Sequence, residues 1–262
     1  MIRVERERVS GVNPVSGVEH SAVVATLVLD RPDKRNALTA DMLLNLREAK
    51  ERAAQDPDVR VILLRGEGPM FCAGFDLDVC RDDPFAMRSL LTALSNTIRV
   101  LRTSRCPMVM AAHGGAIAGG CALLGGADVV VADGAAKFGY PVTRIGVSPA
   151  VSSPFLRQMV AEGAARARLL DSELIEGRRA HALGLVHECV DRPEDVLPRA
   201  KEVARALALK PPGSMEATKR WLSELDGSTD AHAIDGSLHA SLGLAGGDEE
   251  RAMLAKFWEK TR

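Results

Sequence analysis

Two glycine-containing loops are the parts of the sequence best suited to chemistry. Residues 66–76, GEGPMFCAGFD, follow the apolar run 59–64, and residues 113–121, HGGAIAGGC, follow the apolar run 107–112. Glycine at a strand-to-loop junction lets the backbone approach a ligand and turn its N–H groups outward. A helix expected to begin near Gly119 would point its positive end at the same place, which suits an anion or a developing oxyanion. Taken singly, each loop is more simply explained by tight turns and close packing.

Other kinds of site are less well supported. Residues 114–120 could form a phosphate or dinucleotide loop, but they match neither GxGxxG nor GxxxxGK[ST], and no acidic residue follows about 20 positions later to bind a ribose. The six histidines show no HxxxH or HxH spacing, so no metal site is expected. The GxSxG motif of serine hydrolases is absent from the sequence. A metalloenzyme and a serine hydrolase are therefore disfavoured.

The composition is that of a globular protein with a sizeable core. The chain has 262 residues, of which 46% are hydrophobic, and this excludes disorder as its main state. A net charge of -1 provides no general attraction to nucleic acid or to an anionic membrane, and 3% aromatic residues provide few surfaces on which bases could stack. We therefore expect no nucleic-acid partner.

Three features predict a cytoplasmic protein without a membrane span. The five cysteines, an odd number without CxxC spacing, are expected to be free thiols in a reducing compartment. Residues 1–10, MIRVERERVS, are charged throughout and contain no apolar signal region. Residues 108–127 are apolar or glycine except for His113, but their six glycines favour a strand, a turn and a helix over a membrane span.

The order of the predicted elements indicates an α/β fold. Thr39 can cap a helix that Asp56 and Pro57 stop. Strands are predicted at residues 23–30, 59–64, 107–112 and 129–132, and a further helix at 85–103. After residue 190 the strand signals end, and helices are predicted at 194–209, 214–225, 230–242 and 248–260. We therefore divide the chain into a core over residues 1–192 and a helical region over 193–262.

Five longer motifs occur in a fixed order along the chain. They are LDRPDKRNAL at 29–38, FCAGFDL at 71–77, HGGAIAGGCAL at 113–123, ADVVVADGAAKFGYP at 127–141 and FWEK at 257–260. As a set, and over nearly the full length, the chain resembles the crotonase superfamily, also called the enoyl-CoA hydratase/isomerase family. The resemblance implies a crotonase-like α/β spiral of ββα units, followed by a C-terminal helical region that trimerises and often pairs trimers into hexamers.

The resemblance also implies a ligand. That ligand is a coenzyme A thioester, so coenzyme A enters as part of the substrate and no tightly bound cofactor is implied. In the family, two backbone N–H groups form an oxyanion hole, and the matching residues here are Phe75 and Gly119. Reactions of acyl thioesters that pass through an enolate place negative charge on the thioester oxygen, where two such donors stabilise it.

Further binding residues follow from the same resemblance. The backbone of the segment containing Met70, Cys72 and Ala73 would read the adenine. Lys34, Arg35 and Lys260 would lie near the nucleotide phosphates, and for these three side chains the alternative is a solvated surface charge.

One departure from the family pattern concerns proton transfer. Family hydratases carry two glutamates, and the matching positions here hold Ala122 and Val142. Between residues 84 and 161 the acidic residues are Asp128, which we expect to be structural, and Asp133, which we expect to begin a turn. General acid–base catalysis needs a titratable group within reach of the substrate. We therefore predict that ordinary hydration of crotonyl-CoA is weak.

Several side chains remain near the presumed pocket, namely His113, Cys121, Tyr140, Arg144, Ser148, Ser152 and Ser153. Tyr140, the only tyrosine, is the first candidate proton donor, and packing or ligand shaping explains it equally well. His113 is expected to stabilise its turn, and Cys121 to be a small packed thiol. Two hypotheses stay open: an enzyme that acts on a CoA thioester through an enolate, and a non-catalytic acyl-CoA-binding member of the fold.

The predicted C-terminal helices carry more apolar side chains than a small helical layer can bury on itself. These are Leu222, Leu225, Ile234, Leu238, Leu242, Met253, Leu254, Phe257 and Trp258. Association is therefore expected, and the resemblance makes the expected homo-oligomer a trimer or a dimer of trimers.

Overall fold

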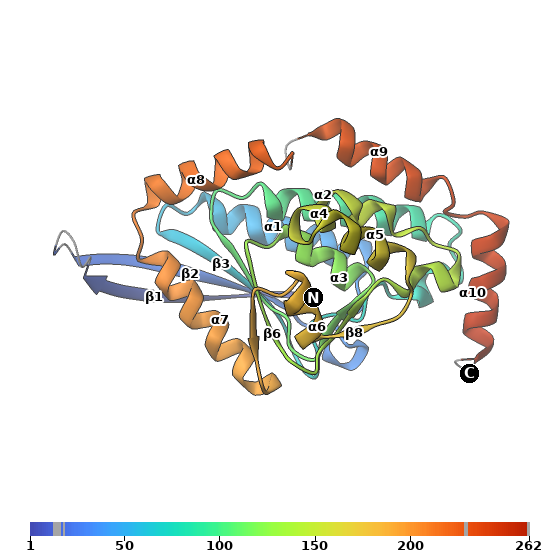
Figure 1. The fold of residues 1–262 in the computed structure, drawn as a ribbon, viewed down its shortest axis with the longest axis horizontal. Coiled ribbons are helices and arrows are strands. Elements are labelled where there is room, and N and C mark those ends of the chain that lie inside the picture. Colours follow the sequence, from blue (N-terminus) through green and yellow to red (C-terminus); the bar gives the residue numbers. More distant parts are fainter. Residues whose placement is uncertain (13–16, 18, 228–229, 261–262) are drawn as a thin grey trace.

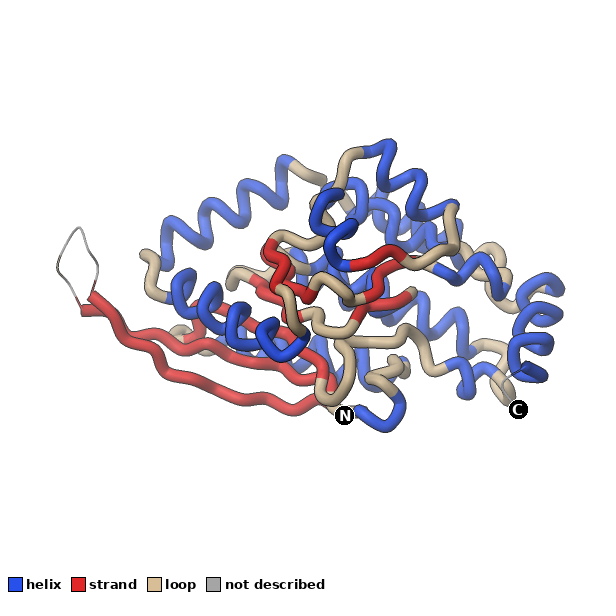
Figure 2. Tube along the Cα trace, turned by 60° about the horizontal axis from the view of Figure 1, so that its bottom comes forward, coloured by secondary structure: helices blue, strands red, loops and turns tan. Residues whose placement is uncertain are grey.

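The centre of the molecule is a six-stranded sheet in the order β1-β2-β3-β4-β6-β9. The computed structural model describes residues 1–12, 17, 19–227 and 230–260. The strands of this sheet are β1 (Ile2–Val12), β2 (Glu19–Leu29), β3 (Val59–Gly66), β4 (Met108–Ala111), β6 (Val129–Asp133) and β9 (Glu188–Val190). The β1–β2 pair is antiparallel and the other neighbours are parallel, so the loops that follow β3 and β4 leave the same edge of the sheet. Figure 2 shows the long strands β1 and β2 projecting to one side.

Both faces of the sheet are covered by helices. Successive side chains of a strand point to opposite faces, and accordingly Leu27 packs into one apolar cluster and Val24 into another. The first cluster includes apolar residues of α1 (Ala40–Gln55) and α2 (Ala86–Arg102), and the second includes those of α7 (Pro193–Ala208). In Figure 1 the strands lie between α7 and the α1–α2 pair. The division of the chain at residue 192 stays a prediction.

A second, smaller sheet adjoins the second glycine loop. It contains β5 (Gly115–Ile117), β7 (Lys137–Gly139) and β8 (Ile175–Glu176) in the order β5-β7-β8. The short helix α3 (Gly119–Leu123) follows β5, which confirms the helix expected at Gly119. The apolar stretch 108–127 is therefore divided among strands and short helices. Among the described residues, no helix combines the length and the apolar character needed to cross a bilayer.

The C-terminal helices are α8 (Pro212–Leu225), α9 (Ala231–Leu242) and α10 (Asp248–Lys260). Figure 1 shows α8 and α9 running along one side of the molecule and α10 standing at its end. Within this chain Ile234 and Leu254 are buried, whereas Leu222 is 56% and Leu225 is 65% exposed. Part of the apolar set is thus uncovered, and the trimer stays a prediction.

Helix α8 is attached to the core by a buried lysine. Lys219 donates from Nζ to the Cys106 carbonyl oxygen (3.1 Å) and to Asp128 Oδ2 (2.5 Å). The same carboxylate accepts the Met108 N–H (2.6 Å). The structural role expected for Asp128 is therefore confirmed.

Most of the predicted elements are present. Thr39 caps α1 by accepting the Met42 N–H (3.2 Å), and α1 ends before Asp56 as predicted. The predictions did not include β1 or the helices α4 (Ser153–Met159), α5 (Glu162–Leu170) and α6 (Gly177–Leu183). β1 is an edge strand with mostly exposed side chains, and its charged run at residues 5–8 interrupts the alternation of apolar and polar residues that would indicate a strand.

Candidate active site

The first glycine loop is joined to the segment before α1 by a short parallel bridge. The Leu38 N–H donates to the Gly74 carbonyl oxygen (2.7 Å), and the Asp76 N–H donates to the Leu38 carbonyl oxygen (2.9 Å). The residue between those two partners, Phe75, therefore has its own N–H on the side away from Leu38. Within the described part of the chain, that N–H has no acceptor.

Asn36 fixes the start of the same loop. Its side chain is fully buried, and Nδ2 donates to the carbonyl oxygens of Glu67 (2.8 Å) and Met70 (2.9 Å) while Oδ1 accepts the Arg31 N–H (2.9 Å). The Arg31 guanidinium also donates to Asp76 Oδ2 (2.8 Å) at the far end of the loop. The polar loop 31–36 therefore holds the first glycine loop at both ends.

Asp133 anchors the second glycine loop. Its carboxylate is 1% exposed and accepts the Gly114 N–H (2.7 Å) and the Ala135 N–H (3.2 Å). The turn predicted at Asp133 is confirmed. The same carboxylate also binds the loop that follows the neighbouring strand β4. His113 Nε2 lies 2.8 Å from the Gly68 carbonyl oxygen, so its ring joins the two loops and stabilises the turn as expected.

The two loops meet at Gly74 and Gly119. Gly74 has φ of +100°, and a Cβ added there would lie 3.0 Å from the Ile117 carbonyl oxygen and 3.6 Å from the Gly119 nitrogen. Ala118 has φ of +52° and ψ of −116°, a strained backbone for a residue other than glycine, and its N–H donates to Gly139 (2.8 Å). The next N–H, that of Gly119, has no acceptor among the described residues. Two unpaired backbone donors therefore lie in neighbouring segments.

A narrow apolar cavity lies beside these donors. Its volume is about 20 Å³, which is room for about one water molecule. It is lined by Phe75, Leu91, Leu94, Ala118, Gly119, Ala122, Tyr140, Val142, Val147, Ser148, Pro149, Val151 and Ser152. Ala122 and Val142 both belong to the lining, and no carboxylate does in the part of the chain that is described.

Tyr140 and Cys121 interact beside the cavity. Burial raises the pKa of Tyr140 well above its ordinary value, and the neighbouring Cys121 raises it further. Burial also raises the pKa of the Cys121 thiol to about 11, so both groups are neutral near pH 7. The geometry makes Cys121 a packed thiol, 1% exposed. A general acid works best with a pKa near the working pH, and the role of Tyr140 as a proton donor stays a prediction.

Comparison with known proteins adds a second kind of observation. The family model for enoyl-CoA hydratase/isomerase matches residues 19–261. A putative enoyl-CoA hydratase from Thermus thermophilus is 36% identical over 78% of this chain and 82% of that protein. The 1,2-epoxyphenylacetyl-CoA isomerase of Escherichia coli is 31% identical over 79% of this chain and 80% of that protein.

A solved structure agrees in fold as well as in sequence. A putative enoyl-CoA hydratase from Mycobacterium avium paratuberculosis superposes with a TM-score of 0.80 at 30% identity, covering 90% of this chain and 92% of that one. The chain belongs to the enoyl-CoA hydratase/isomerase family. The crotonase-type α/β fold expected from the sequence is confirmed.

Within this enoyl-CoA hydratase/isomerase fold, the segment expected to read adenine is largely occupied by its own hydrogen bonds. The Cys72 N–H donates to Gly115 (3.3 Å) and the Ala73 N–H to Arg35 (3.0 Å), while Asn36 binds the Met70 carbonyl oxygen. Burial raises the pKa of the Cys72 thiol to about 12, which leaves it an inert neutral group. Among the described residues the carbonyl oxygens of Phe71 and Ala73 have no donor, so these two groups are left to accept from an adenine amine.

The basic side chains expected near the phosphates are on the surface. Lys34 Nζ lies 3.0 Å from Asp78 Oδ2, and the side chain of Arg35 is exposed. Lys260 is the exposed last residue of α10, a helix that contributes no residue to the cavity lining. Their phosphate contacts stay predictions.

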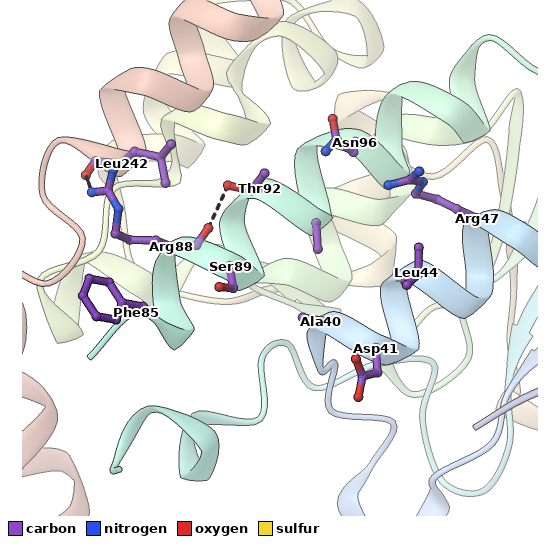
Figure 3. Close-up of a pocket in the computed structure, with 11 residues that line it drawn as sticks. Ala40, Asp41, Leu44, Arg47, Phe85, Arg88, Ser89, Thr92, Asn96 and Leu242 are labelled. Atoms are coloured by element: carbon purple, nitrogen blue, oxygen red, sulfur yellow. Dashed lines mark hydrogen bonds between the residues drawn. The ribbon is translucent and has the colours of Figure 1, made fainter. Parts of the chain in front are cut away.

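A larger hollow, of about 580 Å³, lies between α1 and α2 and shares no lining residue with the cavity beside Gly119. Figure 3 shows Phe85 and Arg88 at one end of it and Leu44 and Arg47 at the other. Arg88 donates to the Leu242 carbonyl oxygen (2.7 Å), which joins α2 to the C-terminal helices. The hollow is therefore separate from the two donors.

The sequence patterns did not identify the side chains that hold the Phe75 and Gly119 N–H groups in position. Asn36 and Asp133 stand out only once their partners are known. Asn36 has φ of +56° in a polar loop after a strand, a conformation that asparagine tolerates. An acidic residue at the end of a buried strand was the visible signal for Asp133.

Proposed function

We propose that the chain is an enzyme that acts on acyl-CoA thioesters through an enolate, whose oxygen accepts the N–H groups of Phe75 and Gly119. The observation that carries the proposal is the pair of unpaired backbone donors beside one apolar cavity. Family membership, and relatives named as acting on enoyl-CoA and epoxyphenylacetyl-CoA, support the thioester class. Coenzyme A enters as part of the substrate.

The chemistry of the proposal depends on where charge develops. When a proton leaves the carbon next to the thioester, or a nucleophile adds to the conjugated double bond, negative charge moves onto the thioester oxygen. Two N–H groups already fixed at that oxygen stabilise the charge without reorganising, and loss of one such donor typically costs about 100- to 1,000-fold in rate. The apolar wall excludes water and so strengthens these hydrogen bonds.

We further propose that ordinary hydration of a 2-enoyl thioester is slow. Water addition needs one group to take a proton from water and another to deliver one to carbon, and each typically contributes about two to four orders of magnitude. Ala122 and Val142, both in the cavity lining, can do neither. The raised pKa of Tyr140 leaves it neutral, so it can donate a hydrogen bond and cannot act as a base near pH 7.

The second candidate is an acyl-CoA-binding protein without turnover. The observation that favours it is the same apolar lining, because a cavity without a carboxylate can hold an acyl group and leave it unchanged. The two candidates differ in turnover and agree in binding.

The test has two parts. Calorimetry measures whether CoA and butyryl-CoA bind, and loss of the crotonyl-CoA absorbance measures hydration, followed by a wider panel of acyl-CoAs. We expect binding, very slow hydration and turnover of another thioester. Binding with no turnover across the panel supports the second candidate, whereas absence of binding removes both.

The oligomer is a separate proposal. We expect a trimer or a dimer of trimers, because apolar residues such as Leu222 and Leu225 on α8 remain exposed in the single chain. Light scattering at micromolar concentration should give three or six times the chain mass, and a monomeric mass contradicts the expectation.

A further inference from the structure

The ring of Phe75 has a position that its backbone role does not require. A Cβ atom added to Gly119 would lie 3.0 Å from Phe75 Cε1 and 3.1 Å from Cδ1. These distances are shorter than ordinary van der Waals contact, so the ring lies directly against the Gly119 backbone. Phe75 therefore supplies one donor through its N–H and packs its ring against the residue that supplies the other.

The cavity beside the ring is too small for an acyl chain. Its volume of about 20 Å³ is room for about one water molecule. Even a short acyl group is larger than that. Binding therefore requires part of the cavity wall to move.

The residues of the wall differ in how firmly they are held. Leu91 and Leu94 are each 2% exposed and Tyr140 is 4% exposed, so their side chains are held within the apolar core. Phe75 is partly exposed and lies at the margin of the core cluster. Side chains at such margins change rotamer more readily than those in a close-packed interior.

The backbone of Phe75 is fixed independently of its ring. The parallel bridge with Leu38 holds the peptide groups on both sides of Phe75. The ring can therefore rotate about its side-chain torsions while the N–H keeps its direction. Displacing the ring enlarges the cavity and leaves the donor in place.

We propose that the Phe75 ring sets the size of the acyl group, and that the substrates are thioesters of short acyl chains. This inference rests on the proposed function. A short chain enters after a small rotation of the ring. A long chain forces the ring off Gly119 entirely, so the contact made there is lost and longer thioesters bind less well.

The experiment compares binding across acyl-chain lengths. Calorimetry with acetyl-, butyryl-, hexanoyl- and decanoyl-CoA should show wild-type affinity at its highest for the short chains and at least about tenfold lower for decanoyl-CoA. In Phe75→Ala the order should reverse, with affinity rising up to about fourfold for each added methylene until the opened space is filled.

The matched control is Phe85→Ala. Phe85 is 69% exposed and lines the separate hollow of Figure 3, so its loss should leave the chain-length profile unchanged. If Phe75→Ala does not fold, Phe75→Leu takes its place, because it keeps an apolar side chain at this position. Its dependence of affinity on chain length should lie between those of the wild type and Phe75→Ala.

The outcomes separate this inference from the proposed function. A flat wild-type profile, or Phe75 variants whose profile parallels the wild type, overturns the inference while binding itself upholds the thioester class. Failure of every thioester and of CoA to bind any folded variant overturns both.

Discussion

The two donors and the wall of the cavity are held by different means. The N–H groups of Phe75 and Gly119 belong to backbone that is fixed by hydrogen bonds through Leu38, Asn36 and Asp133. The wall consists of side chains such as Leu91 and Val147, held by apolar packing. Backbone donors do not depend on the side chains that carry them, so substitutions can change the wall and leave the donors intact. Stabilising charge and moving protons are therefore separable properties of this site.

Removing a donor should have the largest effect. Gly119→Pro removes the N–H, and turnover of any active thioester should fall by at least about two orders of magnitude. Gly119→Ala is the matched control, because it keeps the N–H and adds the same clash with the Phe75 ring. Rates are compared at saturating substrate, with CoA binding as a check on folding. Equal losses in the two variants would show that packing, and not the donor, decides the rate.

Adding carboxylates to the cavity wall tests whether the wall limits the rate because it lacks groups that transfer protons. The double variant Ala122→Glu, Val142→Glu should raise crotonyl-CoA hydration by about tenfold or more, a part of what two positioned acids typically contribute. The control is Ala122→Gln, Val142→Gln, which has similar size and no titratable group. Burial of the new carboxyl groups will lower stability, so both variants are first checked by thermal unfolding. An equal rate in the two double variants contradicts the idea that the wall lacks only proton-transfer groups.

Weakening an anchor of the donors should act on stability. Asp133→Asn replaces one acceptor oxygen with an N–H₂ group that faces a backbone N–H, and should cost about 1–3 kcal/mol in the free energy of unfolding. Denaturant titration measures the change. Asp191→Asn, at an exposed ion pair with Arg178, should change stability by less than about 1 kcal/mol. A similar small effect at Asp133 would mean that the second loop is held by packing.

The smallest effect is expected at Glu250, a buried carboxyl outside the cavity. Burial raises the pKa of Glu250, and its Oε2 accepts the Gly246 N–H (2.7 Å). A raised folded-state pKa favours the neutral acid, so wild-type stability is highest below the ordinary glutamate pKa of about 4.3 and is lost as pH rises through the raised value. Glu250→Gln keeps the acceptor and should gain up to about 1 kcal/mol over wild type between about pH 4 and pH 7.

Thermal unfolding across that pH range provides the measurement, with the exposed Glu249→Gln as the control. Turnover of Glu250→Gln should match the wild type. A loss of turnover with a shifted pH profile would mean that α10 supplies the missing acid, and the contrast between donors and wall would no longer hold.

The sequence predicted elements whose pattern is local. Helix α2 was visible because Met87, Leu90, Leu91 and Leu94 recur at helical spacing and are buried together. The short sheet of β5, β7 and β8 was not predicted, because strands of two or three residues carry too little pattern.

The candidate site was only partly predictable for a related reason. Phe75 and Gly119 were proposed from the family resemblance, since the direction of a backbone N–H is not encoded by a side-chain type. The partners that set those directions are distant in sequence, as for Asn36 with Met70 and Asp133 with Gly114. The positive φ of Ala118 is likewise imposed by surrounding structure against the residue's own preference.

The anchors of the two loops also set an order for biosynthesis. Asn36 lies 34 residues before Met70, so both partners of this hydrogen bond are present once residue 70 has been synthesised. The acceptor of the Gly114 N–H, Asp133, is synthesised 19 residues later, so the second loop cannot make this hydrogen bond before then. At usual rates of translation the interval between the two loops is roughly several seconds. A ribosome-bound nascent chain that stops short of Asp133 therefore lacks the carboxylate that accepts the Gly114 N–H, and the full set of contacts that positions both donors exists only after that residue has been synthesised.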